Sequence, residues 1–320
     1  MNEFELIQKF FTDKSSRRDD VVLGVGDDAA ILRVPEGMQV VATVDTLVEG
    51  VHFPAGLAAE DIGHRALAVN LSDLSAMGAE PAWALLALTL PEANEKWLTQ
   101  FAHGLFALAE RYRVALVGGN IARGPLNVTI AAHGLVPKDT ALTRHGAKPG
   151  DQIYATGELG AAAAGLRLIQ NRIDAQAGER LRTRFVRPEP RIAAGLALRG
   201  LASACIDISD GFFADLVHML QSSGMGGEVN VDTLPLAEEA VELLGRAEAR
   251  QLAFAGGDDY ELCFSLPPSR VVQLKQRLGK LDCSVTQVGV VTAGKTLQCL
   301  QTDGSKWVPD ADTSGYQHFK

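Results

Sequence analysis

The sequence predicts a two-domain protein of mixed α and β structure (α+β). The chain has 320 residues, which is too long for one ordinary hydrophobic core, and 47% of them are apolar. Segments rich in β-branched residues alternate with segments of helical periodicity in both halves, without a short internal repeat. Prolines, glycines and charges crowd together in residues 137–151. We therefore expect an N-terminal domain over residues 1–137 and a C-terminal domain over residues 138–320.

The N-terminal half is expected to begin with a short amphipathic helix and to continue with strands and two longer helices. Residues 38–53, MQVVATVDTLVEGVHF, are rich in β-branched side chains and predict one or two strands. Residues 114–119 and 126–136 are further strand candidates. Helical spacing predicts helices over residues 59–79 and 94–112. The inner stripe of the first helix contains a carboxylate and consists of Ile62, Ala66, Val69, Asp73 and Ala76. The inner stripe of the second helix is apolar and consists of Trp97, Phe101, Leu105 and Leu108.

The C-terminal half shows the same mixture. Residues 152–157 predict a strand and residues 160–170 a helix. A further helix is expected within RPEPRIAAGLALRGLA, residues 187–202, with proline at its start, where a missing amide costs nothing. Residues 204–221, ACIDISDGFFADLVHMLQ, predict a strand that passes into a helix. Residues 283–304 predict two strands joined by a tight turn.

Composition excludes several classes of partner. The formal net charge is −9 and the pI is near 5.3, without a run of Lys or Arg, so neither nucleic acid nor an anionic membrane is expected to bind. The strongly apolar, uncharged stretch PAWALLALTLP is far shorter than the roughly 18 residues of a membrane span. Glu3 and Glu5 stand where a signal peptide carries positive charge. The four cysteines form no CxxC pair, which favours buried thiols and a cytoplasmic location.

Two nucleotide-binding patterns occur in the wrong context. Residues 289–296, GVVTAGKT, satisfy the Walker A pattern, but a strand rather than a helix is expected to follow, so we predict a hairpin turn. Residues 24–29, GVGDDA, satisfy the loose dinucleotide pattern. A helix must follow that pattern, yet Pro35 and Gly37 interrupt one, and two aspartates stand where the pyrophosphate would rest. A Rossmann-type oxidoreductase is therefore a distant alternative.

A third pattern consists of aspartates beside glycine or apolar residues. Taken alone, an aspartate of this kind is more often a helix cap or a turn former. The set is larger than capping requires and has few basic residues nearby: Asp27, Asp28, Asp45, Asp73, Asp207, Asp210, Asp258 and Asp259. Buried carboxylates need compensation, which divalent cations supply. Mg²⁺ combines a few carboxylates with water and phosphate oxygens, and phosphoryl transfer is the chemistry that most needs it.

Eight ordered motifs then resemble the thiamine-monophosphate kinase family, within the superfamily of aminoimidazole ribonucleotide synthetase. They are GVGDDAAIL, TVDTLVEGVHF, AVNLSDLSAMGA, LVGGN, TRHGAKPGD, DISDG, GGDDYEL and GYQHF. The resemblance covers the chain from about Phe4 to Phe319. It implies the two-domain fold of that superfamily, a homodimer in which N-terminal domains pair strands, and a C-terminal α+β domain that completes the active-site cleft. It also implies ATP-dependent phosphorylation of thiamine monophosphate to thiamine diphosphate.

The resemblance further implies roles for individual residues. Several Mg²⁺ ions would be held by Asp28, Thr43, Asp45, Asp73, Asn120, Asp207 and Asp210, of which Asp45, Asp73 and Asp210 would act most directly in catalysis. ATP would contact Gly119, Asn120, Arg144 and Ser209. Thiamine monophosphate would contact His52, Asp258 and Tyr316. The acceptor phosphate is already a nucleophile at neutral pH, so no strong general base is expected.

Two positions depart from the family pattern and keep alternatives open. Asn120 stands where the family usually has aspartate, and Asp258 stands where it usually has glutamate. A non-catalytic or altered-substrate binder of nucleotide and metal in the same superfamily is therefore the alternative. Other members fit less well. Selenophosphate synthetase has a reactive residue near its N-terminus, the hydrogenase-maturation relative ends in cysteine, and aminoimidazole ribonucleotide synthetase lacks the histidine-bearing VDTLVEGVHF segment.

Overall fold

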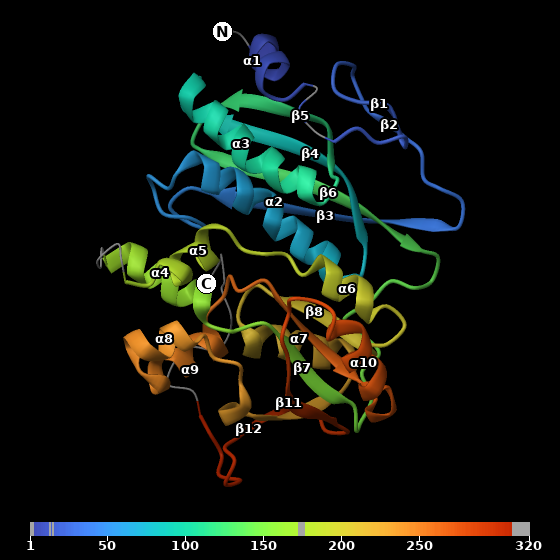
Figure 1. Ribbon diagram of the computed structural model, residues 1–320, viewed down its shortest axis with the longest axis vertical. Coiled ribbons are helices and arrows are strands. Elements are labelled where there is room, and N and C mark those ends of the chain that lie inside the picture. The colour runs from blue at the N-terminus through green and yellow to red at the C-terminus, as the bar shows by residue number, and fades with distance from the viewer. Residues whose placement is uncertain (1–2, 13, 15, 172–176, 309–320) are drawn as a thin grey trace. The chain divides into compact units, whose positions relative to one another are not determined.

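The computed structural model describes residues 3–12, 14, 16–171 and 177–308. The chain forms two compact units, one of residues 1–74 with 79–139 and the other of residues 75–78 with 140–320. Within the described ranges, no helix combines the length and the apolar character that crossing a membrane requires. Each unit has its own sheet and its own buried core (Figure 1).

The N-terminal unit is built on a four-stranded sheet in the order β3-β6-β4-β5. β3 pairs antiparallel with β6, β6 antiparallel with β4, and β4 parallel with β5. A separate two-stranded ribbon joins β1 to β2. The elements are α1 (Glu3–Phe10), β1 (Val21–Leu23), β2 (Ile31–Leu32), β3 (Met38–Val48), α2 (Ala59–Ala76), β4 (Glu80–Leu90), α3 (Glu95–Arg111), β5 (Ala115–Arg123) and β6 (Asn127–Pro137).

One face of this sheet is covered by α2 and α3, which lie on the same side of it (Figure 1). Val128, Ile130 and Ala132 of β6 alternate toward that face and are buried. The two helices approach closely through glycines, because a Cβ added to Gly63 would lie 2.2 Å from the carbonyl oxygen of Phe101, and one added to Gly104 only 1.9 Å from that of Glu60. The helices predicted over residues 59–79 and 94–112 are confirmed, including a buried apolar stripe on α3.

The opposite face of the sheet carries exposed apolar side chains. On β3, Val44 is 62% exposed and Val40 is 44% exposed, and on β4 Leu85 is 37% exposed. Val44 pairs across the sheet with Ala131, which in turn pairs with Leu85, so these residues share one face. An alternating strand with valines on its open face departs from the usual arrangement of polar residues facing water.

The C-terminal unit contains a six-stranded sheet in the order β12-β9-β11-β7-β10-β8. Neighbouring strands are antiparallel except β12 and β9, which are parallel. The elements are β7 (Gln152–Thr156), α4 (Ala161–Asn171), α5 (Glu179–Val186), α6 (Ile192–Leu198), β8 (Ala204–Ile208), α7 (Phe212–Ser222), β9 (Gly226–Asn230), η1 (Val231–Thr233), α8 (Glu238–Leu244), α9 (Arg246–Ala255), β10 (Glu261–Leu266), η2 (Pro268–Arg270), α10 (Val271–Leu278), β11 (Val285–Thr292) and β12 (Leu297–Leu300).

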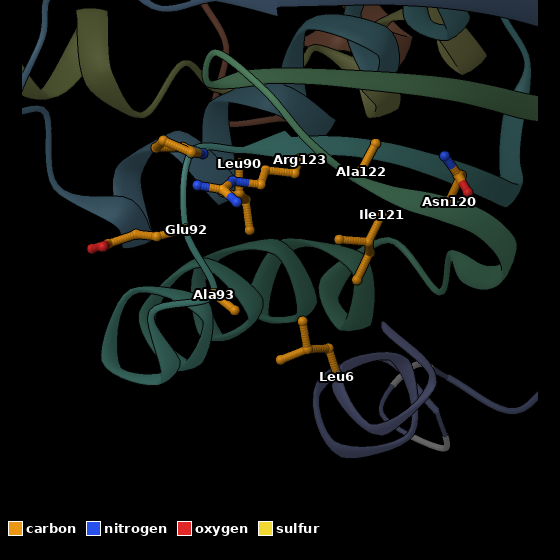
Figure 2. Close-up of a pocket in the computed structure, with 9 residues that line it drawn as sticks. Leu6, Leu90, Glu92, Ala93, Asn120, Ile121, Ala122 and Arg123 are labelled. Carbon is orange, nitrogen blue, oxygen red and sulfur yellow. The ribbon is translucent and has the colours of Figure 1, made fainter. Parts of the chain in front are cut away.

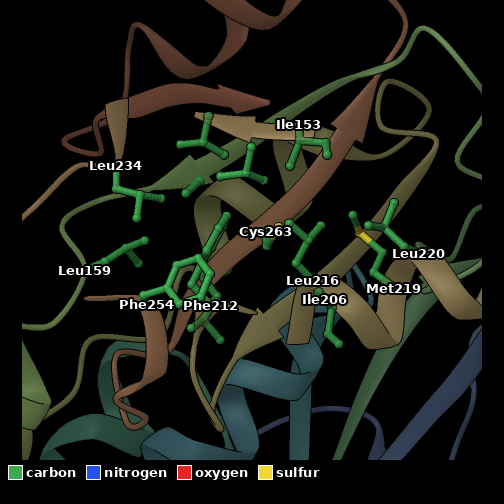
Figure 3. Packing of buried hydrophobic residues seen from close by; sticks show 14 of the residues in the cluster. Ile153, Leu159, Ile206, Phe212, Leu216, Met219, Leu220, Leu234, Phe254 and Cys263 are labelled. Atoms are coloured by element: carbon green, nitrogen blue, oxygen red, sulfur yellow. The ribbon is translucent and has the colours of Figure 1, made fainter. Parts of the chain in front are cut away.

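Helices cover both faces of this sheet, which explains why β7, β8 and β10 are buried almost throughout. Ile153, Ile206 and Cys263 alternate toward a core that they share with α7 and Phe254, and Figure 3 shows Leu216 and Met219 of α7 within it. The residues on the other face of the same strands, such as Tyr154 and Phe264, pack with α6 and α10. A strand buried on both faces reads as a continuous apolar run rather than an alternating one.

Two sequence-based expectations are wrong. β11 and β12 do not form a hairpin, because β9 lies between them and pairs with both. The Walker-like sequence, residues 289–296, is nevertheless followed by the strand β12, so it does not lead into a helix whose N-terminus could bind a phosphate. The helix α6 begins at Ile192, with Arg191 as its N-cap, so Pro188 and Pro190 precede the helix instead of occupying its first turn.

Candidate active site

The strongest candidate centre of the N-terminal unit is formed by Asp45, Asp73 and Thr43. Thr43 and Asp45 lie two residues apart on β3, so both project to the covered face of the sheet, where α2 carries Asp73. The hydroxyl of Thr43 donates a short hydrogen bond to Oδ2 of Asp73. Burial, together with the negative charge of Asp73, raises the pKa of Asp45 to about 6. Two crowded, partly buried carboxylates with a hydroxyl oxygen beside them form a set of donors that a divalent cation would neutralise.

The glycine loop between β1 and β2 carries Asp27 and Asp28. Gly26 has a φ of 123°, a conformation that glycine adopts easily. The backbone N–H of Asp28 donates to Oδ1 of Asp27 at 2.8 Å, so the side chain of Asp27 is engaged within the loop. Both aspartates are exposed, and β2 rather than a helix follows. The dinucleotide-binding alternative is therefore excluded, while the side chain of Asp28 remains accessible to a ligand.

Gly119 and Asn120 lie in the middle of β5, and His52 lies just after β3 in the same unit. Gly119 has a φ of 152°, and a Cβ there would lie 1.8 Å from the carbonyl oxygen of Leu86, so only glycine fits beside β4. Asn120 follows it directly and is exposed. His52 follows β3, and its Nδ1 accepts the backbone N–H of Val48 at 3.0 Å, which assigns the proton of a neutral ring to Nε2.

A pocket of about 700 Å³ lies beside Asn120 in the N-terminal unit. Figure 2 shows Leu6 of α1 facing Ile121 of β5, with Asn120 and Arg123 on opposite sides of Ile121 along the same strand. The lining combines apolar side chains with one amide, one carboxylate and one guanidinium group, and it consists of Leu6, Leu90, Pro91, Glu92, Ala93, Asn120, Ile121, Ala122 and Arg123. A pocket of this size and mixed chemistry suits a small organic ligand with a polar end.

In the C-terminal unit, Asp207, Ser209 and Asp210 lie where β8 ends and α7 begins. Asp207 is the penultimate residue of β8 and is buried. The loop is held by Asp215 in the first turn of α7, because its Oδ2 accepts the backbone N–H groups of three successive residues, Ser209, Asp210 and Gly211, at 3.0, 3.0 and 3.1 Å. Asp215 is a functional candidate that sequence reasoning missed, since an acid in a first helical turn is ordinary.

The loop that carries Asp258 lies directly against this one. The backbone N–H of Asp258 donates to the carbonyl oxygen of Ser209 at 2.8 Å, and that of Tyr260 to Ile208 at 2.8 Å. Both donors have positive φ, 71° for Asp258 and 51° for Tyr260. The hydroxyl of Tyr260 also donates to Oδ1 of Asp258 at 3.1 Å. The structure thus brings a predicted substrate residue beside predicted metal and ATP residues.

Three further observations limit what the structure brings together. The backbone of Arg144 lies near Ser223, whose hydroxyl donates to its carbonyl oxygen at 3.2 Å, so it is at the C-terminal end of α7, away from Ser209 at the other end. Tyr316 lies outside the described residues. In the described part of the chain, no three His, Cys, Asp or Glu side chains converge into a group that could hold a metal ion. Among the predicted metal ligands, the structure brings Asp73 beside Asp45 and Thr43, and the other predicted ligands are distributed over both units.

Comparisons with known proteins identify the family. The model of AIR synthase related protein, N-terminal domain, matches residues 26–136, and the model of its C-terminal domain matches residues 148–300. The chain is 45% identical to thiamine-monophosphate kinase of Escherichia coli K12, over 99% of this chain and 98% of that one. A crystal structure of thiamine-monophosphate kinase from Stenotrophomonas maltophilia K279a is 45% identical, has a TM-score of 0.85, and matches over 91% of this chain and 93% of that one.

A second solved structure, AaThiL complexed with AMPPCP and TMP, is 33% identical to this chain. Its TM-score is 0.78, and the match covers 92% of each chain. The match to the Escherichia coli K12 protein covers 99% of this chain and therefore includes both units. The chain belongs to the thiamine-monophosphate kinase family.

Proposed function

We propose that this chain transfers the γ-phosphoryl group of ATP to the phosphate of thiamine monophosphate, with thiamine diphosphate as the product. The observation that carries the proposal is the group of Thr43, Asp45 and Asp73 in a chain of this family. Its crowded carboxylates would hold a divalent cation, which would neutralise phosphate charge. Because the acceptor is itself a phosphate, the main task of the site is to align two anions and reduce their repulsion.

The donor set fits Mg²⁺, which prefers carboxylate and hydroxyl oxygens and leaves several positions to water and phosphate. In our proposal the ions are held by Asp28, Thr43, Asp45, Asp73, Asn120, Asp207 and Asp210. When bound, Mg²⁺ supplies charge neutralisation on the transferring group and on the acceptor. The residues of the chain fix where that charge lies: Asp45 and Asp73 from a strand and a helix that pack together, and Asp210 from a loop that Asp215 holds.

Nucleotide and acceptor are assigned to separate residues. We place ATP against Gly119, Asn120, Arg144 and Ser209, and the missing Cβ at Gly119 lets β5 lie close to Leu86 of β4, which fixes the backbone that leads into Asn120. Asn120 lines the pocket of Figure 2, so a nucleotide bound to it would extend into that pocket. Thiamine monophosphate is assigned to His52, Asp258 and Tyr316. An Nε2–H of His52 can donate to a phosphate oxygen of the substrate.

A homodimer accounts for the open face of the N-terminal sheet. Val40 and Val44 on β3 and Leu85 on β4 form an apolar face of a kind that monomeric proteins seldom leave in water. β3 is also an edge strand, with unpaired backbone groups along one side. Pairing of two N-terminal units would cover both features. We place the reaction in the cytoplasm, in keeping with four cysteines that are all free thiols.

The departure at Asn120 leads to a prediction. Replacing Asn120 with aspartate restores a charged oxygen ligand, so we expect the half-saturating Mg²⁺ concentration to fall by roughly tenfold while kcat changes little. Initial rates measured across a Mg²⁺ titration at saturating ATP test this. Asn127→Asp, at the start of β6 and separated from β5 by β4, is the matched control and should not alter the Mg²⁺ dependence. An unchanged Mg²⁺ curve for Asn120→Asp would remove Asn120 from the metal set.

The proposed function is tested by ADP release with three acceptors side by side: thiamine monophosphate, thiamine and an aminoimidazole ribonucleotide precursor. We expect ADP release only with thiamine monophosphate and only with Mg²⁺. ATP and Mg²⁺ binding without turnover on any acceptor would favour the alternative of a non-catalytic binder. Turnover with another acceptor would identify an altered-substrate member of the superfamily.

A further inference from the structure

We propose that Asp215 is a positioning residue that couples two loops of the C-terminal unit, Ser209–Gly211 and Gly256–Tyr260. The first loop carries predicted metal and ATP contacts, and the second carries Asp258, a predicted substrate contact, so the inference rests on the proposed function. Asp215 itself touches neither ligand. It acts through the backbone of the first loop, and the first loop acts on the second.

The carboxylate of Asp215 fills a backbone site that would otherwise bind an anion. Three consecutive N–H groups, from Ser209, Asp210 and Gly211, converge on its Oδ2, and the residue is 3% exposed. Successive N–H groups that point to one position form a concavity typical of phosphate sites. Here the protein's own carboxylate occupies it, so a nucleotide phosphate cannot. The loop can therefore bind a ligand through the side chains of Ser209 and Asp210, whose hydroxyl and carboxylate oxygens suit a cation.

The carbonyl side of the first loop holds the second. Ser209 and Ile208 accept the backbone N–H groups of Asp258 and Tyr260, both at 2.8 Å. The backbones of the two loops are in close contact, because a Cβ on Gly257 would lie 2.3 Å from the carbonyl oxygen of Ser209, and one on Gly211 3.0 Å from the backbone of Ala255. A displacement of the first loop is therefore transmitted to Asp258.

The second loop is held in conformations that it would leave if released. Asp258 and Tyr260 both have positive φ, a conformation that is unfavourable for a residue with a Cβ. On its other side the loop is anchored by the buried Asp259, which accepts the N–H groups of Gly160 at 2.7 Å and Ala162 at 3.2 Å at the start of α4. Two carboxylates therefore fix the position of Asp258: Asp215 acts through the first loop, and Asp259 acts through its hydrogen bonds to the start of α4.

Asp215→Ala and Asp215→Asn in the full-length protein test the coupling. Loss of the acceptor in Asp215→Ala should speed amide hydrogen exchange at residues 209–211 and also at Asp258 and Tyr260, by about tenfold or more. The half-saturating Mg²⁺ concentration and the KM for thiamine monophosphate should rise together. Asp215→Asn retains an oxygen that accepts N–H groups, so it should recover most of the exchange protection and both constants.

Asp151→Ala is the matched control for a loss of stability alone. Asp151 is 4% exposed and accepts the N–H of Lys148 at 2.9 Å and the hydroxyl of Ser203 at 2.6 Å, at the end of β7 remote from both loops. We expect it to lower Tm without moving either constant. The coupling is refuted if Asp215→Ala lowers Tm and leaves exchange at Asp258 and the KM unchanged, or if it alters the Mg²⁺ dependence alone.

Asp210→Asn and Asp258→Asn separate the coupling from the site assignments on which it rests. If the first leaves the Mg²⁺ dependence unchanged and the second leaves the KM unchanged, the assigned roles are wrong, and amide exchange alone then decides whether Asp215 couples the loops. If both shift their constants and Asp215→Ala shifts neither, the assignments stand and the coupling is wrong.

Discussion

Asp45→Asn is expected to lower kcat by about a thousandfold or more while the fold remains intact. The carboxylate is proposed to carry Mg²⁺ against the transferring group, a contribution of several kcal/mol, and each 1.36 kcal/mol corresponds to a factor of ten in rate. Asparagine keeps the shape of the side chain and removes its repulsion with Asp73, the charge that helps to raise the pKa of Asp45 to about 6. The measurement is kcat at saturating ATP, thiamine monophosphate and Mg²⁺, together with Tm.

Asp61→Asn provides the matched control for Asp45→Asn. Asp61 lies in the first turn of α2, twelve residues or roughly 18 Å along the helix from Asp73. The substitution Asp61→Asn removes one negative charge from the same unit without changing a proposed metal ligand, so kcat should stay within about twofold of the unmodified protein. Near-normal kcat in Asp45→Asn, with an unaltered Mg²⁺ requirement, would remove Asp45 from the active site.

Glu261→Gln is expected to lower the free energy of unfolding of the C-terminal unit by about 3–5 kcal/mol. Glu261 is fully buried at the start of β10. It accepts Nη2 of Arg184 at 2.6 Å, Nε of Arg191 at 2.7 Å and the hydroxyl of Thr156 at 2.7 Å. Glutamine would leave two guanidinium groups without their counter-charge in a poorly hydrated site. Urea denaturation at neutral pH measures the difference.

The pH dependence of stability gives a second readout for Glu261. Burial raises its pKa, but the hydrogen bond and charge of Arg191, with those of Arg184, outweigh burial and leave the pKa lowered. A carboxyl whose pKa is lowered in the folded state stabilises it above the pKa of the unfolded chain, and that stabilisation is lost as the pH falls through the folded pKa. The gap in stability between Glu261→Gln and the unmodified protein should therefore narrow in acid.

Glu248→Gln is the control for this pair. Glu248 and Arg167 form an ion pair in the same unit, but their side chains are 47% and 46% exposed, so the loss should stay below about 1 kcal/mol. Equal losses in Glu261→Gln and Glu248→Gln would show that the buried network adds no more than a surface pair.

The family, the mixed α+β fold and the longer helices could be predicted from the sequence. The helices α2 and α3 were predictable because their apolar residues repeat at helical spacing over 18 and 17 residues. The comparisons confirm the family that the ordered motifs indicated, and with it the kinase activity predicted for the chain. A motif can be recognised from the sequence because its residues are consecutive in the chain.

Long-range pairing could not be predicted. β11 and β12 are close in sequence and look like a hairpin, but which strand lies between them depends on where β9 packs, more than fifty residues away along the chain. The same limit applies within the candidate site. The family motifs implied that Asp73 of α2 and Thr43 of β3 share a site. Nothing in the segment FADLVHM indicates that Asp215 accepts three backbone N–H groups.

The most direct test of the account is to follow the label from ATP carrying ³²P at the γ-position, with thiamine monophosphate and Mg²⁺ present. Direct transfer predicts that the label appears in the terminal phosphate of thiamine diphosphate, one equivalent for each ADP formed, and that Asp45→Asn abolishes this product. Label found only in inorganic phosphate, or thiamine diphosphate formed without label, would contradict the account.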